Sequence, residues 1–328
     1  MPNDAPIQAN NEATATVLRA KQRPPLLARW WVYQRERFPL ATHVPLIAAF
    51  SFCTLTFSML ARGVVALPSL KAVVVAFCTA LLFFLEMRIA DEFKDADEDA
   101  RYRPYRPVPR GLVTLRELAI VAVAAGAVQT LLALWLSPAL LPFLLLTWAY
   151  LGLMCREFFV RDWLKAHPAT YMWSHMLILP LIDLYGTACD WRVANVAPPL
   201  GLGILLFVSF ANGFILEVGR KMRAPEDEEY GVVTYTAHWG RHRAVLVWMV
   251  ALTITAIAAA LATFQIETPW EIVAYVAVAA LAVVMGLRFL RRPAPGSGKS
   301  IELVSGLWTL VLYLSLGAIP LALRLTFA

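Results

Sequence analysis

"AVVVAFCTALLFFLEMRIADEFKDADEDARYRPYRPVPRG" (residues 72–111) passes from an apolar run into dense charge. Residues 72–90 are almost wholly apolar, and with their neighbours they reach the roughly 20 residues that a helix needs to cross a bilayer. Residues 91–111 then carry six acidic residues followed by four arginines. We therefore predict a membrane-spanning helix that ends at a charged loop outside the bilayer.

The composition of the whole chain agrees with this prediction. Of its 328 residues, 59% are hydrophobic and 16% are charged, and the mean hydropathy is +0.62. Soluble domains usually carry about 25% charged residues. The composition excludes a soluble domain and predicts an integral membrane protein. The four cysteines and five histidines show no spacing typical of a disulfide framework or a zinc site.

Nine stretches are long and apolar enough to span a bilayer as helices. They are residues 44–62, 70–90, 115–135, 137–155, 167–187, 197–217, 244–264, 270–288 and 302–323. Spans of a β-barrel would alternate in polarity, and these do not. We predict an all-α membrane domain over residues 44–328. Residues 1–43 are expected to form a cytosolic tail, with an interfacial helix at ARWWVYQRERFPL, residues 28–40.

The distribution of basic residues predicts the orientation. With the N-terminus in the cytosol, 25 of the 29 Lys and Arg residues fall on the cytosolic side. Cytosolic loops are enriched in these residues, so the split supports both the orientation and the number of spans. Residues 91–115 and 218–243 then form two long cytosolic loops. The expected location is the bacterial inner membrane, with the active site facing the cytosol.

The acids after residue 90 have the spacing of a metal site. If the helix continues, Glu92, Asp95 and Asp99 lie on one face, where their charges repel unless a cation neutralises them. Ligand sets made of oxygen alone suit Mg²⁺, which keeps coordination positions open for phosphate oxygens. A solvated charged loop is the competing interpretation, and we prefer it for Asp97 and Glu98.

The arginines that follow suit a diphosphate. Prolines at positions 104, 107 and 109 prevent a helix and stiffen the segment. Forked guanidinium groups on a stiff loop can hold the outer phosphate oxygens, and we expect this of Arg103 and Arg106. For Arg101 and Arg116, anchoring on the cytosolic side is the preferred interpretation.

Residues 91–111 resemble the first signature of the UbiA superfamily of intramembrane prenyltransferases. That signature reads Asn-Asp-x-x-Asp-x-x-x-Asp, followed by Arg-Pro-x-x-x-Gly. The matching positions are Glu92, Asp95 and Asp99, then Arg106, Pro107 and Gly111, with Asp91 where Asn is usual. The resemblance implies nine transmembrane helices around a central cavity. It also implies Mg²⁺-dependent transfer of an isoprenoid from its diphosphate to an acceptor.

Residues 217–240, EVGRKMRAPEDEEYGVVTYTAHWG, resemble the second signature of the superfamily. Gly231, Thr234, Gly240 and Asp227 match it. Where many members have two aspartates four residues apart, this chain has Glu217 and Lys221. We predict that fewer carboxylates hold metal here and that Lys221 contacts the diphosphate directly. The predicted metal ligands are Asp91, Glu92, Asp95, Asp99, Glu217 and Asp227.

A third basic loop lies within residues 155–176. The resemblance implies one basic residue of this loop near the diphosphate, and Arg161 and Lys165 are equal candidates. The predicted catalytic residues are Asp95, Arg106 and Lys221. The predicted substrate-binding residues are Arg103, Arg106, Arg161, Lys165, Arg220, Lys221 and Asn212. The expected partners are a prenyl diphosphate donor, a lipophilic or aromatic acceptor and membrane lipid, without nucleic acid.

Two other functions remain open from the sequence. Some superfamily members transfer a phosphoribosyl group onto a polyprenyl phosphate. A transporter is the other alternative, and it predicts broken helices and acids at mid-membrane depth. The acids of this chain cluster at helix ends on one side, which favours catalysis at a cytosolic mouth. The aspartate spacing of the CDP-alcohol phosphotransferases is absent.

Overall fold

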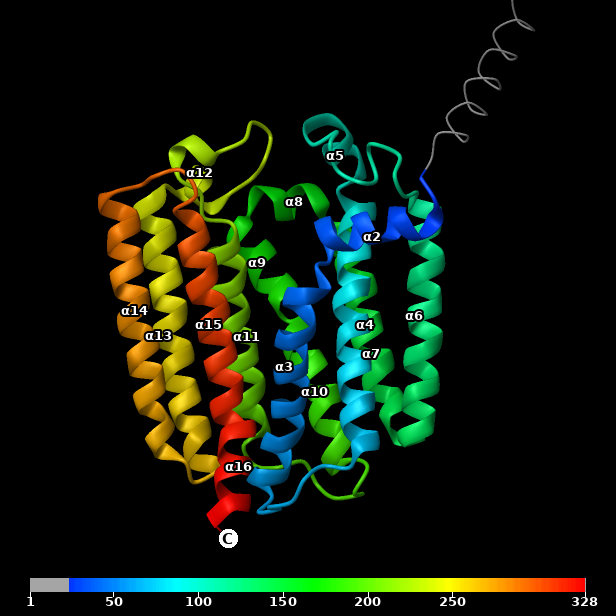
Figure 1. The fold of residues 1–328 in the computed structure, drawn as a ribbon, viewed down its shortest axis with the longest axis vertical. Coiled ribbons are helices and arrows are strands. Elements are labelled where there is room, and N and C mark those ends of the chain that lie inside the picture. Colours follow the sequence, from blue (N-terminus) through cyan, green and yellow to red (C-terminus); the bar gives the residue numbers. More distant parts are fainter. Residues whose placement is uncertain (1–23, 328) are drawn as a thin grey trace, which may run out of the picture.

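The computed structural model describes residues 24–327, and all regular elements within them are helical. The long helices form one bundle, and α2, α5, α8 and α12 lie at the same end of it, which we call the loop end (Figure 1). The helices are α2 (Leu26–Arg37), α3 (Leu40–Ala61), α4 (Leu70–Lys94), α5 (Ala96–Tyr102), α6 (Leu115–Leu136), α7 (Leu141–Cys155), α8 (Arg161–Ala166), α9 (Pro168–Met176), α10 (Ile178–Trp191), α11 (Leu202–Arg220), α12 (Tyr235–Trp239), α13 (Arg241–Gln265), α14 (Ile272–Arg291), α15 (Gly298–Leu316) and α16 (Ala318–Phe327).

Eight helical segments are long and apolar enough to cross a membrane. They are Leu40–Ala61, Leu70–Lys94, Leu115–Leu136, Pro138–Cys155, Leu202–Arg220, Arg241–Gln265, Pro269–Arg291 and Gly298–Phe327. This confirms the all-α membrane class. The prediction of nine continuous spans needs a correction, because the fifth stretch, residues 167–187, forms two shorter helices, α9 and α10.

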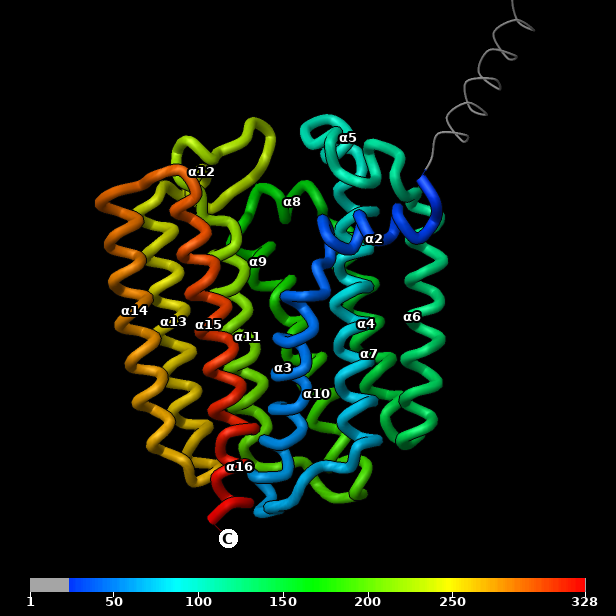
Figure 2. Tube along the Cα trace, viewed as in Figure 1, coloured from blue at the N-terminus to red at the C-terminus, as the bar shows by residue number. Residues whose placement is uncertain are grey.

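A proline explains where the fifth stretch breaks. Pro180 has no N–H to donate to the carbonyl of Met176, and its ring crowds that carbonyl. Met176 is the last residue of α9, and α10 begins two residues later. In the tube view the chain passes from α9 into α10 as it runs away from the loop end (Figure 2). Pro320 stands in the same relation to Leu316, where α15 gives way to α16.

The helix contacts bring the two charged loops to the same end of the bundle. Helix α4 packs on α3, α6, α7 and α10, whereas α11 packs on α9, α10, α13 and α15. Helix α10 therefore contacts both. The C-terminal residues of α4 and α11, Lys94 and Arg220, both lie at the loop end (Figure 1). The segments that resemble the two signatures thus start from neighbouring parts of one surface.

Two polar residues inside the bundle join helices to one another. Asp183 of α10 is fully buried and accepts hydrogen bonds from the hydroxyls of Thr54 (2.8 Å) and Tyr313 (2.9 Å). Asn212 of α11 accepts one from the hydroxyl of Thr309 (3.1 Å). Polar groups buried in a membrane protein need such partners. Asn212, which we predicted to bind substrate, lies instead in the contact between α11 and α15.

Helix α2, at the position of the predicted interfacial helix, docks on the protein. Tyr33 of α2 is buried in a small apolar cluster with Val113, Ile89 of α4 and Leu118 of α6. Arg29 forms an ion pair with Glu117 of α6 (3.0 Å), and Arg37 forms one with Glu92 of α4. These contacts hold α2 across the loop-end termini of α4 and α6. The predicted tail before residue 24 lies outside the described residues.

Candidate active site at the loop end

The last turn of α4 presents two acids on one face. The backbone N–H of Asp95 donates to the carbonyl of Asp91 (2.9 Å), so the helical geometry continues to Asp95. Residues four apart on a helix are neighbours, which places the two side chains together. Asp91 lies 3.2 Å from Arg88 and 3.6 Å from Lys94, and its side chain is 35% exposed.

Asp95 differs from the other acids of this segment because no ion pair to it occurs among residues 24–327. Burial raises the pKa of the Asp95 carboxyl; Lys94 opposes the rise, and the charges of Asp91 and Asp99 add to it. A carboxylate in these surroundings gains from a cation. Asp95 is therefore the least neutralised acid of the site.

Two of the three acids that the spacing placed on one face have ion-pair partners of their own. Helix α4 ends at Lys94 and α5 begins at Ala96, so the helix is interrupted between them. Glu92 is 2% exposed and pairs with Arg37 of α2. Asp99 is held between Arg103 and Arg106. Both acids thus have a positive partner of their own, whereas Asp95 has no ion pair among residues 24–327.

Arg103 and Arg106 both converge on Asp99. Their guanidinium groups lie 3.0 Å and 2.5 Å from its two carboxylate oxygens. Ion pairs of this kind fix a guanidinium group in one orientation. The arginines that we predicted to bind diphosphate are therefore positioned as a pair by one of the predicted metal ligands.

At the end of α11, Glu217 is surrounded by cations. It is 5% exposed, and its oxygens lie 2.5 Å from Arg220 and 2.7 Å from Lys221. The hydroxyl of Tyr235 also donates to it, at 3.4 Å. Asp91 on α4 is within Coulombic range of both Arg220 and Glu217. The ends of α4 and α11 therefore face one another, and the α11 side is the more positive.

These contacts decide which predicted ligands fit Mg²⁺. No three of the His, Cys, Asp and Glu residues in the described part of the chain come together as a metal site. Asp227 accepts a hydrogen bond from the backbone of Gly296 (2.7 Å), in the turn before α15. Mg²⁺ is usually held by one or two carboxylates together with substrate phosphates. Asp91, whose side chain is 35% exposed with cations at 3.2 Å and 3.6 Å, and Asp95 suit that pattern better than Glu217, whose side chain is 5% exposed with cations at 2.5 Å and 2.7 Å.

The third basic loop reaches the first acid loop. Arg161 of α8 donates to the backbone carbonyl of Lys94 (3.1 Å), and Lys165 pairs with Glu98. Both candidates therefore lie beside the junction of α4 and α5. Arg161 is bonded to the end of α4 itself, and Lys165 to the more distant α5.

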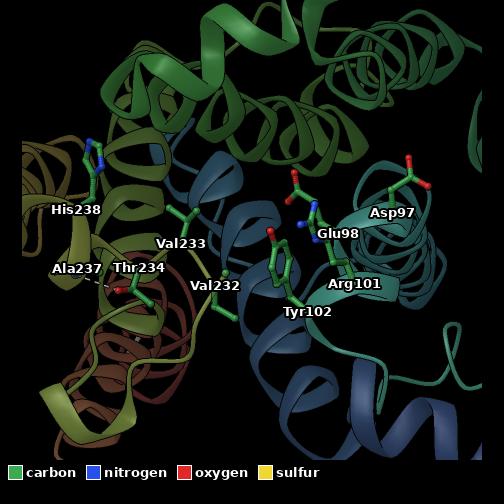
Figure 3. Close-up of a pocket in the computed structure, with 10 residues that line it drawn as sticks. Asp97, Glu98, Arg101, Tyr102, Val232, Val233, Thr234, Ala237 and His238 are labelled. Atoms are coloured by element: carbon green, nitrogen blue, oxygen red, sulfur yellow. Dashed lines mark hydrogen bonds between the residues drawn. The ribbon is translucent and has the colours of Figure 1, made fainter.

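A pocket of about 600 Å³ opens between the two charged loops. Its lining residues are Asp97, Glu98, Arg101, Tyr102, Gly231, Val232, Val233, Thr234, Ala237 and His238. Figure 3 shows the first group, on and beside α5, facing the second group across the opening. The pocket gives the loop end an entrance walled by both signature segments.

The two loops also touch directly. The hydroxyl of Tyr105 donates to Glu229 (3.0 Å), and the rings of Tyr102 and Tyr230 meet edge to face. Gly231 has φ of +76°, and a Cβ atom there would lie 2.3 Å from the Tyr102 ring. Only glycine allows both that conformation and that approach. We call these contacts the loop clasp.

Gly231→Ala is expected to lower kcat/KM for the donor roughly tenfold, because displaced loops misplace the groups that hold the substrate. The measurement is the steady-state rate with detergent-solubilised protein. Gly240→Ala is the matched control, since Gly240 has φ of +78° but no atom within 4 Å of an added Cβ. Equal losses in the two variants would show that backbone strain, and not the loop clasp, causes the effect.

Three residues of this region were not singled out from the sequence. Lys94 contacts Asp91, Glu157 contacts Lys94, and Arg37 pairs with Glu92. Lys94 lies inside the acidic segment, so its position in the sequence could have indicated that it belongs to the site. Glu157 and Arg37 are far from that segment in the chain, and no local pattern connects them to it.

Comparison with known proteins bears on this arrangement. A sequence model described as the UbiA prenyltransferase family matches residues 49–309. No curated protein sequence matches the chain. A solved structure described as digeranylgeranylglyceryl phosphate synthase in membranes is 13% identical, with a TM-score of 0.59, and the match covers 89% of this chain and 99% of that one.

Two further structures are each 13% identical. The apo structure of a UbiA homologue from Aeropyrum pernix K1 has a TM-score of 0.60, and the match covers 85% of this chain and 98% of that chain. A UbiA homologue from Archaeoglobus fulgidus bound to DMAPP and Mg²⁺ has a TM-score of 0.49, with 84% and 98% covered. The first two likenesses show a common helical fold.

Proposed function

The chain belongs to the UbiA prenyltransferase family, and from this premise we propose that it transfers an isoprenoid group from a prenyl diphosphate to a lipophilic or aromatic acceptor, with loss of diphosphate. One observation carries the proposal. Asp91 at the end of α4 lies within Coulombic range of Glu217 and Arg220 at the end of α11, where two apolar helices leave the membrane. Asp95 lies one helical turn beyond Asp91, and Lys221 pairs with Glu217. Such a place suits a molecule with a phosphorylated head and an apolar tail.

We assign magnesium to the α4 side of this site. Asp91 and Asp95 would hold a single Mg²⁺, and when bound the ion supplies positive charge to the departing diphosphate. On the α11 side, Lys221 and Arg220 would donate directly to diphosphate oxygens. Their contacts with Glu217 hold both side chains at the site beforehand.

The residues of the chain then favour breakage of the bond between the prenyl carbon and the diphosphate oxygen. The electron pair of that bond leaves with the diphosphate, whose negative charge is met by the fixed cations. The allylic cation left behind must be kept from water, and the apolar bundle around α4 and α11 serves this need. The acceptor attacks that carbon and loses a proton. Arg103 and Arg106, oriented by Asp99, would hold the outer phosphate oxygens.

We also propose that the loop end faces the cytosol, in a bacterial inner membrane. The support is the excess of Lys and Arg in the segments that form this end. Accessibility of a cysteine introduced at Arg110, which is partly exposed in its ion pair with Glu36, would check it. Labelling from the periplasm by a membrane-impermeant reagent would contradict the orientation.

The test of the function is a substrate panel. Protein in lipid nanodiscs is incubated with Mg²⁺, labelled prenyl diphosphates of increasing length and a set of aromatic and lipid acceptors. We expect a prenylated product that needs both Mg²⁺ and the prenyl donor. A parallel arm offers phosphoribosyl diphosphate with a polyprenyl phosphate. Product from that arm alone would replace prenyl transfer by phosphoribosyl transfer.

A further inference from the structure

Lys94 is a buried ammonium group beside the predicted magnesium site. We propose that it binds the diphosphate of the donor and that Glu157, Tyr171 and His175 hold it in place for this task. The inference rests on the proposed function and adds to it a cation on the α4 side. Nothing in the two signature patterns assigns this role, because position 94 is a variable position of the first signature.

The distances around Lys94 show which of its hydrogens are used. Its side chain is 10% exposed, and its Nζ donates to the hydroxyl of Tyr171 at 2.5 Å. The same Nζ lies 3.6 Å from Asp91 and 3.4 Å from Glu157. An ammonium group has three hydrogens to donate, and a normal hydrogen bond is 2.7–3.2 Å long. Both carboxylates therefore lie beyond normal hydrogen-bond length from Nζ. A phosphate oxygen next to Asp91 can accept one of the hydrogens of Nζ.

Glu157 reaches Lys94 through an unusual turn. Glu157, Phe158 and Phe159 have φ values of +48°, +51° and +61°, in the left-handed region that residues with a side chain seldom adopt. Three such residues in a row persist only where the surrounding contacts hold them. Here the Phe158 ring packs edge to face on Tyr150 and on His175. The turn places the Glu157 carboxylate, 4% exposed, against the end of α4.

His175 fixes both of the other partners of Lys94. Its Nδ1 lies 2.8 Å from the carbonyl oxygen of Tyr171, and since a carbonyl only accepts, Nδ1 carries a hydrogen. Its Nε2 lies 3.3 Å from Glu157, and its ring stacks on the ring of Tyr171 at 3.9 Å. Tyr171 and Glu157 thus both lie against one imidazole. Lys94 is held from this side, and its remaining neighbour, Asp91, belongs to the predicted magnesium site.

The arrangement also explains why α8 is bonded to α4. Arg161 donates to the backbone carbonyl of Lys94 (3.1 Å), so the residue is fixed through its main chain as well as its side chain. The strained turn at Glu157, the stacked rings of Tyr171 and His175, and Arg161 all position Lys94. Strain held at one position in this way is typical of functional sites.

The test measures binding of inorganic pyrophosphate to the full chain in nanodiscs by calorimetry, with Mg²⁺ present. We expect Lys94→Gln to weaken binding at least about tenfold, as for the loss of a hydrogen bond to a charged group. Lys94→Arg keeps the charge and should recover part of the affinity. Lys71→Gln is the matched control, because Lys71 is on the same helix at its other end, over Trp135. The pyrophosphate affinity of Lys71→Gln should equal that of the wild type.

A purely structural role predicts a different result. If Lys94 only neutralises Asp91 and Glu157, then Lys94→Gln lowers the Tm and leaves the pyrophosphate affinity of the folded protein unchanged, which would overturn the proposal. Should that variant not fold, the double variant Lys94→Gln with Glu157→Gln removes the unpaired charge as well. Wild-type affinity in the folded double variant would equally overturn the proposal, and weakened affinity would support it.

Glu157→Gln alone tests the positioning. We expect it to raise the KM for the prenyl diphosphate about threefold, with kcat little changed, since the ammonium remains but is held less firmly. An unchanged KM would remove Glu157 from the account. If the wild type binds neither pyrophosphate nor a prenyl diphosphate, the proposed function itself fails, and that outcome is distinct from a variant that binds like the wild type.

Discussion

Asp95→Asn is expected to lower the rate of prenyl transfer roughly 100-fold, because a neutral amide holds a divalent cation far less well than a carboxylate does. The fold should be at least as stable as before. Asp95 has no ion pair among the residues that the structure describes, and the variant loses the repulsion from Asp91 and Asp99 together with the attraction to Lys94. Activity and stability should therefore change in opposite directions.

The pKa of Asp95 gives the sign of the stability change. Burial raises this pKa above its usual value, so the folded state binds the proton more tightly than the unfolded state does. The stabilisation from this group is then present at low pH, and it is lost as the pH rises from the unfolded pKa through the folded one. Above the folded pKa the wild type without metal has lost it. The Tm of Asp95→Asn, measured without Mg²⁺, should equal or exceed that of the wild type.

The matched control is Asp97→Asn, which removes an exposed acid two residues away. It should keep near wild-type rates. The measurements are kcat at saturating donor and Mg²⁺, and the Tm by differential scanning fluorimetry. Product formation by Asp95→Asn at the wild-type rate would exclude Asp95 from the site.

The second large effect is expected at Lys221. Lys221→Ala should raise the KM for the prenyl diphosphate about tenfold or more, the usual cost of a lost hydrogen bond to a charged group. Lys221 is 2.7 Å from Glu217. The charge of Lys221 stands in place of a metal ligand. Added Mg²⁺ should therefore do little to lower the donor KM of Lys221→Ala.

Lys221→Asp distinguishes this explanation from simple loss of charge. A second carboxylate beside Glu217 provides the pair of oxygen ligands that Mg²⁺ requires. We expect this variant to be weak at low Mg²⁺ and to recover as the Mg²⁺ concentration is raised, unlike Lys221→Ala. Arg223→Ala is the control, since within residues 24–327 the side chain of Arg223 donates only to main-chain carbonyls, of Arg220 and Met222. An unchanged donor KM and Mg²⁺ optimum in Lys221→Ala would remove Lys221 from the site.

The spans and the positions of the charged loops could be predicted because both depend on local composition. A run such as residues 70–90 is apolar throughout, and a bilayer accepts such a run as a helix whatever its neighbours are. The break in the fifth span was also encoded locally, by the missing N–H of Pro180, but its effect depends on the carbonyl four residues earlier. A count of apolar residues does not contain that information.

The pairing of the acids could not be predicted, because each partner comes from a distant part of the chain. The spacing predicted that Glu92 lies with Asp95 and Asp99, whereas in the structure Glu92 forms an ion pair with Arg37. The turn at Glu157 has no glycine to mark its left-handed conformation, so only the folded contacts reveal it. Glu217 and Lys221 do lie together, because four residues make about one turn of a helix, so this contact is local in the sequence.

The central claim is that one metal ion, held by Asp91 and Asp95, and the cations of α11 bind the two sides of one diphosphate. The most direct measurement is a crystal structure of the protein with Mn²⁺ in place of Mg²⁺ and a non-reactive prenyl thiodiphosphate, with metal located by anomalous scattering. The account predicts a single metal peak beside Asp91 and Asp95, with Lys221 on the diphosphate. A second peak beside Glu217, or a diphosphate bound away from both helix ends, would contradict it.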